Sequence, residues 1–210
     1  MLSPDPDATT YPAAPWAMTG SLWLSLFRVR EDVDDLRPAG VYGAAFVSYE
    51  PGSVLTYSEL LVARPVPDPG GGRGRRVSIV DIWVDSAASM LGGRELWAIP
   101  KGLCDFELES AHRGPFSTTE WSASTGRRPI ARATFHDVSR AALRLPFRGA
   151  TWQPPLEPGG QPKAATLQGS ARTLPCRGRW EFAADGPLGF LVGHRPWASF
   201  RMAGFRMSFG

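Results

Sequence analysis

The sequence predicts a single, mainly β domain, a β-rich α+β fold whose strands close into an antiparallel barrel with one or two short helices. The length of 210 residues matches one ordinary domain. Hydrophobic residues make up 43% of the chain and charged residues 20%, which is enough apolar material for a core. The 23 glycines and 20 prolines favour many short elements joined by turns over a helical bundle.

Short apolar segments, several with alternating polar and apolar residues, predict about ten strands. An antiparallel β protein must cover or pair its edge strands, and a closed barrel or sandwich does this. The predicted strands are residues 21–27, 41–49, 55–66, 77–84, 103–108, 116–122, 130–135, 142–145, 180–182, 189–192 and 199–209.

Two short helices are predicted between these strands. Residues 31–36 carry several acids and end before Pro38. Residues 87–91 follow Asp85 or Ser86 as the N-cap, and Gly92-Gly93 predicts the end of this helix. Residues 1–15 contain four prolines and predict a flexible N-terminal lead-in, so that the single β-barrel domain covers residues 16–210.

Several functional classes are excluded by composition and motifs. A net charge of +3 is too small for a dedicated nucleic-acid binder. The N-terminus lacks the features of a signal peptide, and no segment approaches the roughly 18 apolar residues of a membrane span, so we expect a cytoplasmic protein without a membrane partner. No metal site is predicted, because His112, His136 and His194 are far apart and Cys104 and Cys176 lack a CxxC spacing. No phosphate-binding, dinucleotide-binding or GxSxG motif is present, and we expect no cofactor.

The lysines are the most informative residues. Only two of the 23 basic residues are lysines, Lys101 and Lys163, and Lys101 follows Pro100 among leucine, tryptophan and isoleucine. Unlike arginine, lysine can lose its proton, and burial favours this by lowering the pKa from about 10.4. A neutral amine attacks a ketone to form an imine. The protonated imine stabilises the carbanion left by loss of CO₂, or an enamine that attacks an aldehyde.

A second interpretation of Lys101 remains open from the residues alone. Strict alternation through Gly102 would place Lys101 on the same face as Asp105 and Glu107, as an ordinary exposed lysine. A glycine in a strand often marks a bulge or a close approach of another backbone, so regular alternation is not assured here.

The segment Gly93–Lys101, GRELWAIPK, resembles the GRE-(L/I)-x-x-(Y/F)-PK block of the acetoacetate decarboxylase family, whose lysine forms a Schiff base with the substrate. Upstream, Tyr57-Ser58-Glu59 resembles the family's Tyr-x-Glu, whose glutamate lies beside that lysine. The order and spacing of the two motifs extend the resemblance over roughly residues 20–110. The family fold is a β-barrel that encloses an apolar pocket, commonly in oligomers.

The resemblance implies a cofactor-independent lyase and a homo-oligomer. Lys101 would be the nucleophile, Glu59 the acid/base group, and Trp83 and Trp97 parts of the pocket wall around a small-molecule keto substrate. Decarboxylation of a β-keto acid is the first predicted reaction. The alternatives are aldolase, dehydratase or tailoring chemistry on another carbonyl compound through the same lysine, and a non-catalytic barrel that binds small molecules.

Three positions depart from the family pattern. The family's second lysine corresponds to Gly102, its second pocket glutamate falls near Ala44, and its substrate-orienting arginine falls near Ser21 or Leu22. In acetoacetate decarboxylase itself, a neighbouring cationic group activates the nucleophilic lysine. Activation here would therefore have to come from desolvation or from an arginine that the fold brings near. The departures affect recognition of a small β-keto carboxylate rather than imine formation.

Overall fold

The computed structural model describes residues 10–71, 75–138 and 142–210. The first nine residues of the predicted lead-in therefore lie outside the described part, as do residues 72–74 and 139–141. The elements, in chain order, are β1 Trp16–Val29, β2 Gly40–Tyr49, β3 Tyr57–Pro67, β4 Arg75–Val84, α1 Ala87–Trp97, β5 Lys101–Leu103, β6 Asp105–Arg113, β7 Phe116–Thr125, β8 Arg128–Asp137, β9 Arg144–Gln153, β10 Lys163–Pro175, β11 Arg177–Phe182, a 3₁₀ turn Gly189–Leu191 and β12 Ala198–Phe209.

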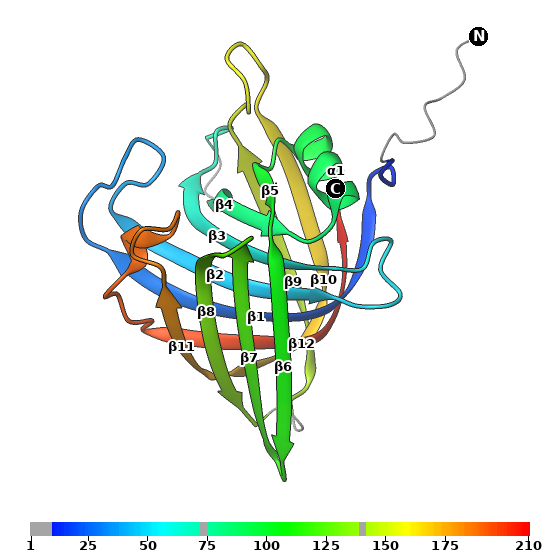
Figure 1. The fold of residues 1–210 in the computed structure, drawn as a ribbon. Helices are drawn as coiled ribbons and strands as arrows, with labels where there is room; N and C mark the ends of the chain where they lie inside the picture. Colours follow the sequence, from blue (N-terminus) through cyan, green and yellow to red (C-terminus); the bar gives the residue numbers. More distant parts are fainter. Residues whose placement is uncertain (1–9, 72–74, 139–141) are drawn as a thin grey trace.

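Among the described residues, seven strands close into a barrel, which confirms the predicted mainly β fold (Figure 1). Their order around the barrel is β3-β2-β1-β12-β10-β9-β4, and pairing between β3 and β4 completes the ring. Neighbouring strands are antiparallel except β9 and β4, which meet through one parallel pair, Val77 with Thr151. β5 extends the sheet alongside β4, also in parallel.

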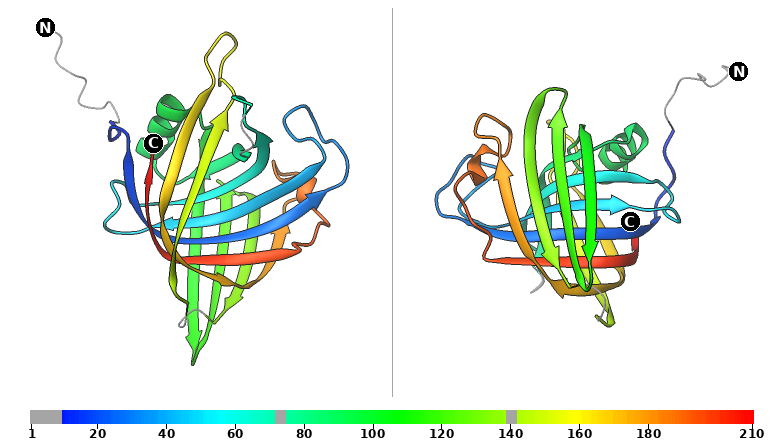
Figure 2. Two further views of the ribbon diagram at one scale, coloured as in Figure 1. Left: turned by 180° about the vertical axis from the view of Figure 1, so that it is seen from behind. Right: turned by 60° about the horizontal axis from the view of Figure 1, so that its bottom comes forward.

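A second sheet, β11-β8-β7-β6, lies across the outside of the barrel, with its strands crossing those of β1, β2 and β3 steeply (Figures 1 and 2). Aromatic side chains fill the space between the two layers. The ring of Phe46 on β2 stacks on Trp121 of β7 and on Trp180 of β11, with centroid distances of 5.1 and 5.2 Å. Side chains on the opposite faces of the barrel strands, such as Trp16 and Val47, point inward and form a separate core.

The helix α1 is longer than predicted. It begins after Ser86, whose hydroxyl accepts a hydrogen bond from Ser89 N at 3.2 Å, and ends at Ala98 in the left-handed conformation with φ of 54°. The predicted end at Gly92-Gly93 is wrong, because the helix continues through both glycines. A Cβ at Gly92 would lie 2.7 Å from the ring of Trp16, so glycine is required here for close packing. None of the described helices has the length and hydropathy needed to cross a bilayer.

Two further local predictions are wrong. Residues 31–36 form a turn rather than a helix, because the Asp34 carboxylate accepts hydrogen bonds from the backbone N–H groups of Leu36 and Arg37. The Arg37 guanidinium also binds Asp81 of β4, with Nε 3.0 Å from Oδ2, and holds this turn on the barrel. Residues 189–192, predicted as a strand, contain the 3₁₀ turn Gly189–Leu191.

Candidate active site

Lys101 lies inside the barrel, with only 4% of its surface exposed. Asp105 and Glu107, which strict alternation would place on the same face, are exposed. The alternation breaks at Cys104, because the chain there leaves β5 beside β4 and enters β6 beside β7, in the other sheet. The interpretation of Lys101 as an exposed lysine is therefore wrong.

Three oxygen atoms surround the Lys101 amine. Its Nζ lies 3.0 Å from Glu59 Oε2, 2.9 Å from Ser89 Oγ and 3.4 Å from the hydroxyl of Tyr57. The amine also lies 5.0 Å from the centre of the Tyr57 ring, on which the cation is favourably placed. An ammonium has three hydrogens to donate, and each of these oxygens can accept one.

Glu59 is as deeply buried as Lys101, with 3% of its surface exposed. Its place on β3 directs the side chain inward, and its second oxygen, Oε1, accepts a hydrogen bond from the Tyr49 hydroxyl at 3.3 Å. Both carboxylate oxygens therefore have partners. Side chains alternate between the two faces of a strand, so Tyr57 and Glu59 both point into the barrel, while Ser58 between them is only partly buried.

The pKa of Lys101 is raised, whereas the sequence predicts that burial lowers it. Burial lowers this pKa, as expected, but the negative charge of Glu59 and the Tyr57 hydroxyl outweigh burial and hold it above its ordinary value. The free protein thus contains an ammonium–carboxylate ion pair. Burial raises the pKa of Tyr57, and it raises the pKa of Tyr49 still further with help from the charge of Glu59, so both phenols stay protonated.

The helix α1 positions the lysine side chain. A Cβ at Gly93 would lie 2.7 Å from Cδ and 2.9 Å from Cε of Lys101, so the aliphatic part of the lysine rests directly on the helix at a glycine. Arg94 donates from Nη1 to the carbonyl oxygen of Lys101 at 3.2 Å, and Ser89 contributes its hydroxyl. Glu95, the third residue of the GRE block, accepts a hydrogen bond from Tyr11 and so ties the chain before β1 to the helix.

A cavity of about 330 Å³ opens beside the ion pair inside the barrel. Its lining is mostly aliphatic and aromatic, with Lys101 and Glu59 as the charged members and Tyr49, Tyr57 and Thr151 as the uncharged polar ones. The apolar lining residues are Trp16, Met18, Leu22, Leu24, Val47, Leu61, Ala63, Val77, Ile79, Ile82, Trp97, Ile99, Leu167, Met207 and Phe209.

The two predicted wall residues have different positions. Trp97 lines the cavity and contacts Trp16 and Phe209 edge to face, with ring centroids 4.8 and 4.7 Å away. Trp83 does not line it: this side chain points to the other face of β4 and packs against the core beneath the second sheet. The assignment of Trp83 to the pocket wall is therefore corrected by its place on the strand, next to inward-pointing Ile82.

The positions that depart from the family pattern also differ in environment. Gly102 faces away from the cavity, and a Cβ there would lie 3.3 Å from Cδ1 of Trp83. Ala44 is buried in the core beneath the second sheet, whereas Leu22 lines the cavity and Ser21 hydrogen-bonds to Glu50 at 3.2 Å. No arginine side chain among the described residues lines the cavity, so no such cation activates Lys101.

Sequence reasoning missed Ser89 and Tyr49. Ser89 lies in a predicted helix and gives no signal beyond its type, because its role depends on how α1 packs against β5. Tyr49 ends a predicted strand, and only the pairing of Tyr49 with Tyr57 across β2 and β3 brings its hydroxyl to Glu59. Tyr57 is visible as part of a motif, but its contact with the lysine is not.

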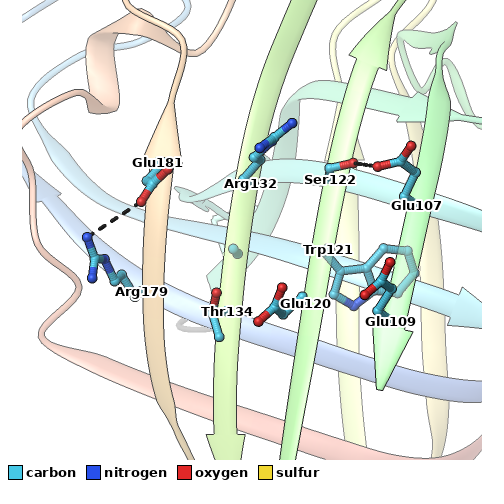
Figure 3. Close-up of a pocket in the computed structure, with 10 residues that line it drawn as sticks. Glu107, Glu109, Glu120, Trp121, Ser122, Arg132, Thr134, Arg179 and Glu181 are labelled. Atoms are coloured by element: carbon cyan, nitrogen blue, oxygen red, sulfur yellow. Dashed lines mark hydrogen bonds and ion pairs between the residues drawn. The ribbon is translucent and has the colours of Figure 1, made fainter. Parts of the chain in front are cut away.

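A second hollow, of about 390 Å³, lies on the outer face of the four-stranded sheet (Figure 3). Charged side chains from all four strands line it, among them Glu109, Glu120, Arg132 and Arg179. These side chains lie on an open surface, and the ion pair between Arg179 and Glu181 has a separation of 3.6 Å with both members mostly exposed. Solvent weakens the interactions between charges on such an open surface, so the buried barrel cavity is the better candidate for catalysis. Within the described ranges, no group of three or more histidine, cysteine, aspartate or glutamate side chains is arranged to hold a metal ion.

The acetoacetate decarboxylase family model matches residues 33–167 of the chain. The chain belongs to this family. Among solved structures, the enduracididine biosynthesis enzyme MppR is similar with a TM-score of 0.65 at 16% identity, covering 99% of this chain and 90% of that one. An acetoacetate decarboxylase from Legionella pneumophila has a TM-score of 0.63 at 17% identity, covering 98% and 89% of the two chains. Another MppR structure, with a TM-score of 0.63 at 16% identity and coverage of 99% and 92%, contains the condensation product of pyruvate and imidazole 4-carboxaldehyde. No curated protein matches the chain significantly.

Proposed function

We propose that this member of the acetoacetate decarboxylase family is a lyase that forms a Schiff base between Lys101 and a carbonyl substrate. The observation that carries the proposal is the 3.0 Å contact between Lys101 Nζ and Glu59 Oε2, both buried at the wall of an apolar cavity. Perturbed, buried titratable pairs beside a cavity are typical of catalytic sites.

The first step requires a neutral amine. In the resting ion pair, Lys101 holds the proton, but transfer along the hydrogen bond to Glu59 Oε2 gives an uncharged amine and an uncharged carboxylic acid. A dry, apolar environment favours this neutral pair over two separated charges. When a substrate excludes water from the cavity, the proton therefore moves toward Glu59.

The second step forms the imine. The Lys101 nitrogen attacks the carbonyl carbon and gives a carbinolamine, and Glu59 supplies the proton with which the carbinolamine oxygen leaves as water. The products are a protonated imine, a Glu59 carboxylate and one water molecule. The positive imine then draws electrons from the adjacent carbon–carbon bond, which in a β-keto acid breaks with loss of CO₂ and leaves a neutral enamine. The Glu59 carboxylate takes up a proton from water and then protonates the enamine carbon.

Decarboxylation of a β-keto acid is the first reaction that we propose for this site. Aldol or retro-aldol chemistry is the second candidate, and one observation favours it: among the described lining residues, Lys101 is the cation of the cavity and none is left to bind a substrate carboxylate. The condensation product held by MppR is consistent with such chemistry in a protein of this fold. The predicted homo-oligomer stays a prediction.

Reductive trapping tests the proposal. Incubation with ketones and keto acids, reduction with borohydride and mass mapping should give an adduct on Lys101. In Lys101→Arg the adduct should be lost without loss of the fold, because a guanidinium does not become a neutral nucleophile at accessible pH. The chain has one other lysine, Lys163, and Lys163→Arg is the matched control that should keep the adduct. An adduct that persists in Lys101→Arg would remove Lys101 as the nucleophile, and measurement of CO₂ release would separate decarboxylation from aldol chemistry.

A further inference from the structure

The charges of the cavity leave no place for an anionic substrate group. Among the described residues, the lining contains one cation, Lys101, and one anion, Glu59, and these two neutralise each other at 3.0 Å. Formation of a protonated imine keeps this balance, because the imine carries the charge that the ammonium carried. A substrate carboxylate would then be buried among apolar side chains without a counter-ion, which is strongly unfavourable.

The exposure of the lining residues gives the cavity a closed and an open end. Along β1, Trp16 and Met18 are 2% and 4% exposed, whereas Leu22 and Leu24 are partly exposed. Exposure rises in the same direction along β3, from Glu59 to Ala63, since β1 and β3 both pair antiparallel with β2. The reactive amine thus lies at the closed end, and apolar side chains line the open end.

The same gradient holds along β4, where exposure rises from 2% at Ile82 to 37% at Val77. Ile82 pairs with Lys101, and Val77 pairs with Thr151. These β4 residues are five positions apart, which is roughly 16 Å of strand. The cavity is therefore elongated between the lysine and the neighbourhood of Thr151.

Thr151 offers a second polar contact at the far end. It lines the cavity and is only 3% exposed, yet its Oγ1 has no hydrogen-bond partner among the described residues. Buried hydroxyls are normally hydrogen-bonded, and an exception at the wall of a cavity points to a bound group that supplies the partner.

We propose that the substrate is an uncharged, elongated, apolar ketone or aldehyde whose carbonyl reaches Lys101 and whose far end carries a hydrogen-bonding oxygen near Thr151. The cavity of 330 Å³ accommodates about eleven non-hydrogen atoms, at about 30 Å³ each. This inference rests on the proposed Schiff-base chemistry for its reactive end, and on the composition of the cavity alone for the rest of the substrate. It favours aldol or retro-aldol chemistry over decarboxylation, because an uncharged substrate has no carboxylate to lose as CO₂.

A series of methyl ketones from butan-2-one to nonan-2-one tests the apolar tail. The concentration for half-maximal reductive trapping on Lys101 should fall roughly fourfold for each added methylene until the cavity is filled. Acetoacetate, which is small and charged, should need a concentration roughly 10²-fold or more above that of nonan-2-one. Equal or better trapping with acetoacetate would overturn the inference while leaving the Schiff-base proposal intact.

A charged chain of similar length separates size from charge. The probe 8-oxononanoate carries a carboxylate where nonan-2-one ends in a methyl group. This charge would lie near Thr151, which is 3% exposed, so we expect the probe to trap at least about 10²-fold more weakly. Similar trapping of the two probes would contradict an uncharged substrate.

Isothermal titration calorimetry with nonan-2-one on the unmodified protein measures binding independently of imine formation. Binding without an adduct would refute the Schiff-base proposal and support the proposed class of ligand. Absence of both binding and adduct would refute both proposals.

Thr151→Val tests the distal contact, since valine has the shape of threonine without the hydroxyl. The variant should weaken binding of 9-hydroxynonan-2-one about fivefold to tenfold and leave binding of nonan-2-one unchanged. Thr151→Ser, which keeps the hydroxyl, should retain the preference for the hydroxyketone. Loss of binding for both probes in Thr151→Val, or for neither, would remove Thr151 as a contact for a substrate oxygen.

Discussion

Two largely buried ion pairs of nearly identical length have different surroundings in this molecule. Lys101 and Glu59 meet at 3.0 Å inside the barrel, and Arg201 of β12 and Asp137 of β8 meet at 3.0 Å between the barrel and the second sheet. The Arg201 guanidinium also lies 5.0 Å from the Trp23 ring, in the aromatic layer. Neither Arg201 nor Asp137 lines the barrel cavity.

Burial of an ion pair is therefore not by itself a sign of function. The pair between Arg201 and Asp137 joins two layers of the fold, and a guanidinium stays protonated whatever its surroundings. The pair between Lys101 and Glu59 faces an apolar cavity and has a cation that can give up its proton. What distinguishes the candidate site is the cavity beside the pair and the identity of the cation.

Of the substitutions in the two ion pairs, Glu59→Gln should slow the Schiff-base chemistry most. The glutamine keeps the shape of the side chain but cannot shuttle a proton, so turnover or trapping should slow by roughly 10²–10⁴-fold. The variant should also lower the pKa of Lys101, because the carboxylate that raises it is gone. The pH dependence of the trapping rate should then show its acid limb at lower pH than in the unmodified protein. An unchanged rate and an unchanged limb would exclude Glu59 as the acid/base group.

Gly93→Ala should have the next largest effect on the chemistry. An alanine Cβ at this position would overlap the Lys101 side chain, so the amine should move away from Glu59 and Ser89. Displacement of a reacting group by about 1 Å can cost about 10²-fold in rate. Trapping kinetics measure the loss, and circular dichroism checks that the helix is kept, since alanine favours a helix interior more than glycine does. Wild-type trapping in this variant would show that contact with α1 does not position the lysine.

Asp137→Asn should change trapping least and stability most. Removal of one partner from a buried ion pair costs about 3–5 kcal/mol of the free energy of unfolding, which urea denaturation measures. Because the pair lies outside the cavity, the trapping rate of the folded variant should stay within about twofold of the original. A large loss of trapping at full folding would mean that the two layers are coupled and that the second ion pair also supports the chemistry.

Much of the fold could be predicted from the sequence, because the turn-rich composition and the alternating segments directly reflect strand geometry. The length of α1 could not, since Gly92 and Gly93 are typical of a helix end and only their tertiary neighbours explain why they lie within one. The turn at residues 31–36 is mistaken for a helix because acids before a proline fit a short helix, whereas the Asp34 side chain here closes a turn.

The candidate site could be predicted in part. Lys101 and Glu59 follow from two motifs, and the structure brings them together at hydrogen-bond distance. The residues alone leave the burial of Lys101 open, because the break at Cys104 depends on which sheet each strand joins. The expected low pKa is wrong for the free protein, since composition around the lysine does not show how strongly a carboxylate offsets its burial. The contributions of Ser89 and Tyr49 depend on packing between distant elements.

The strand that carries the proposed nucleophile is the shortest among the described ones, with the three residues of β5. So few ladder contacts cannot by themselves fix a side chain to a fraction of an ångström. Its placement is instead imposed from the sides, by the helix glycine beneath the lysine stem, the arginine on its carbonyl and the carboxylate at its tip. A segment too short to be rigid alone becomes rigid through its surroundings, so changes in α1 should affect the reactive amine more than changes within β5 itself.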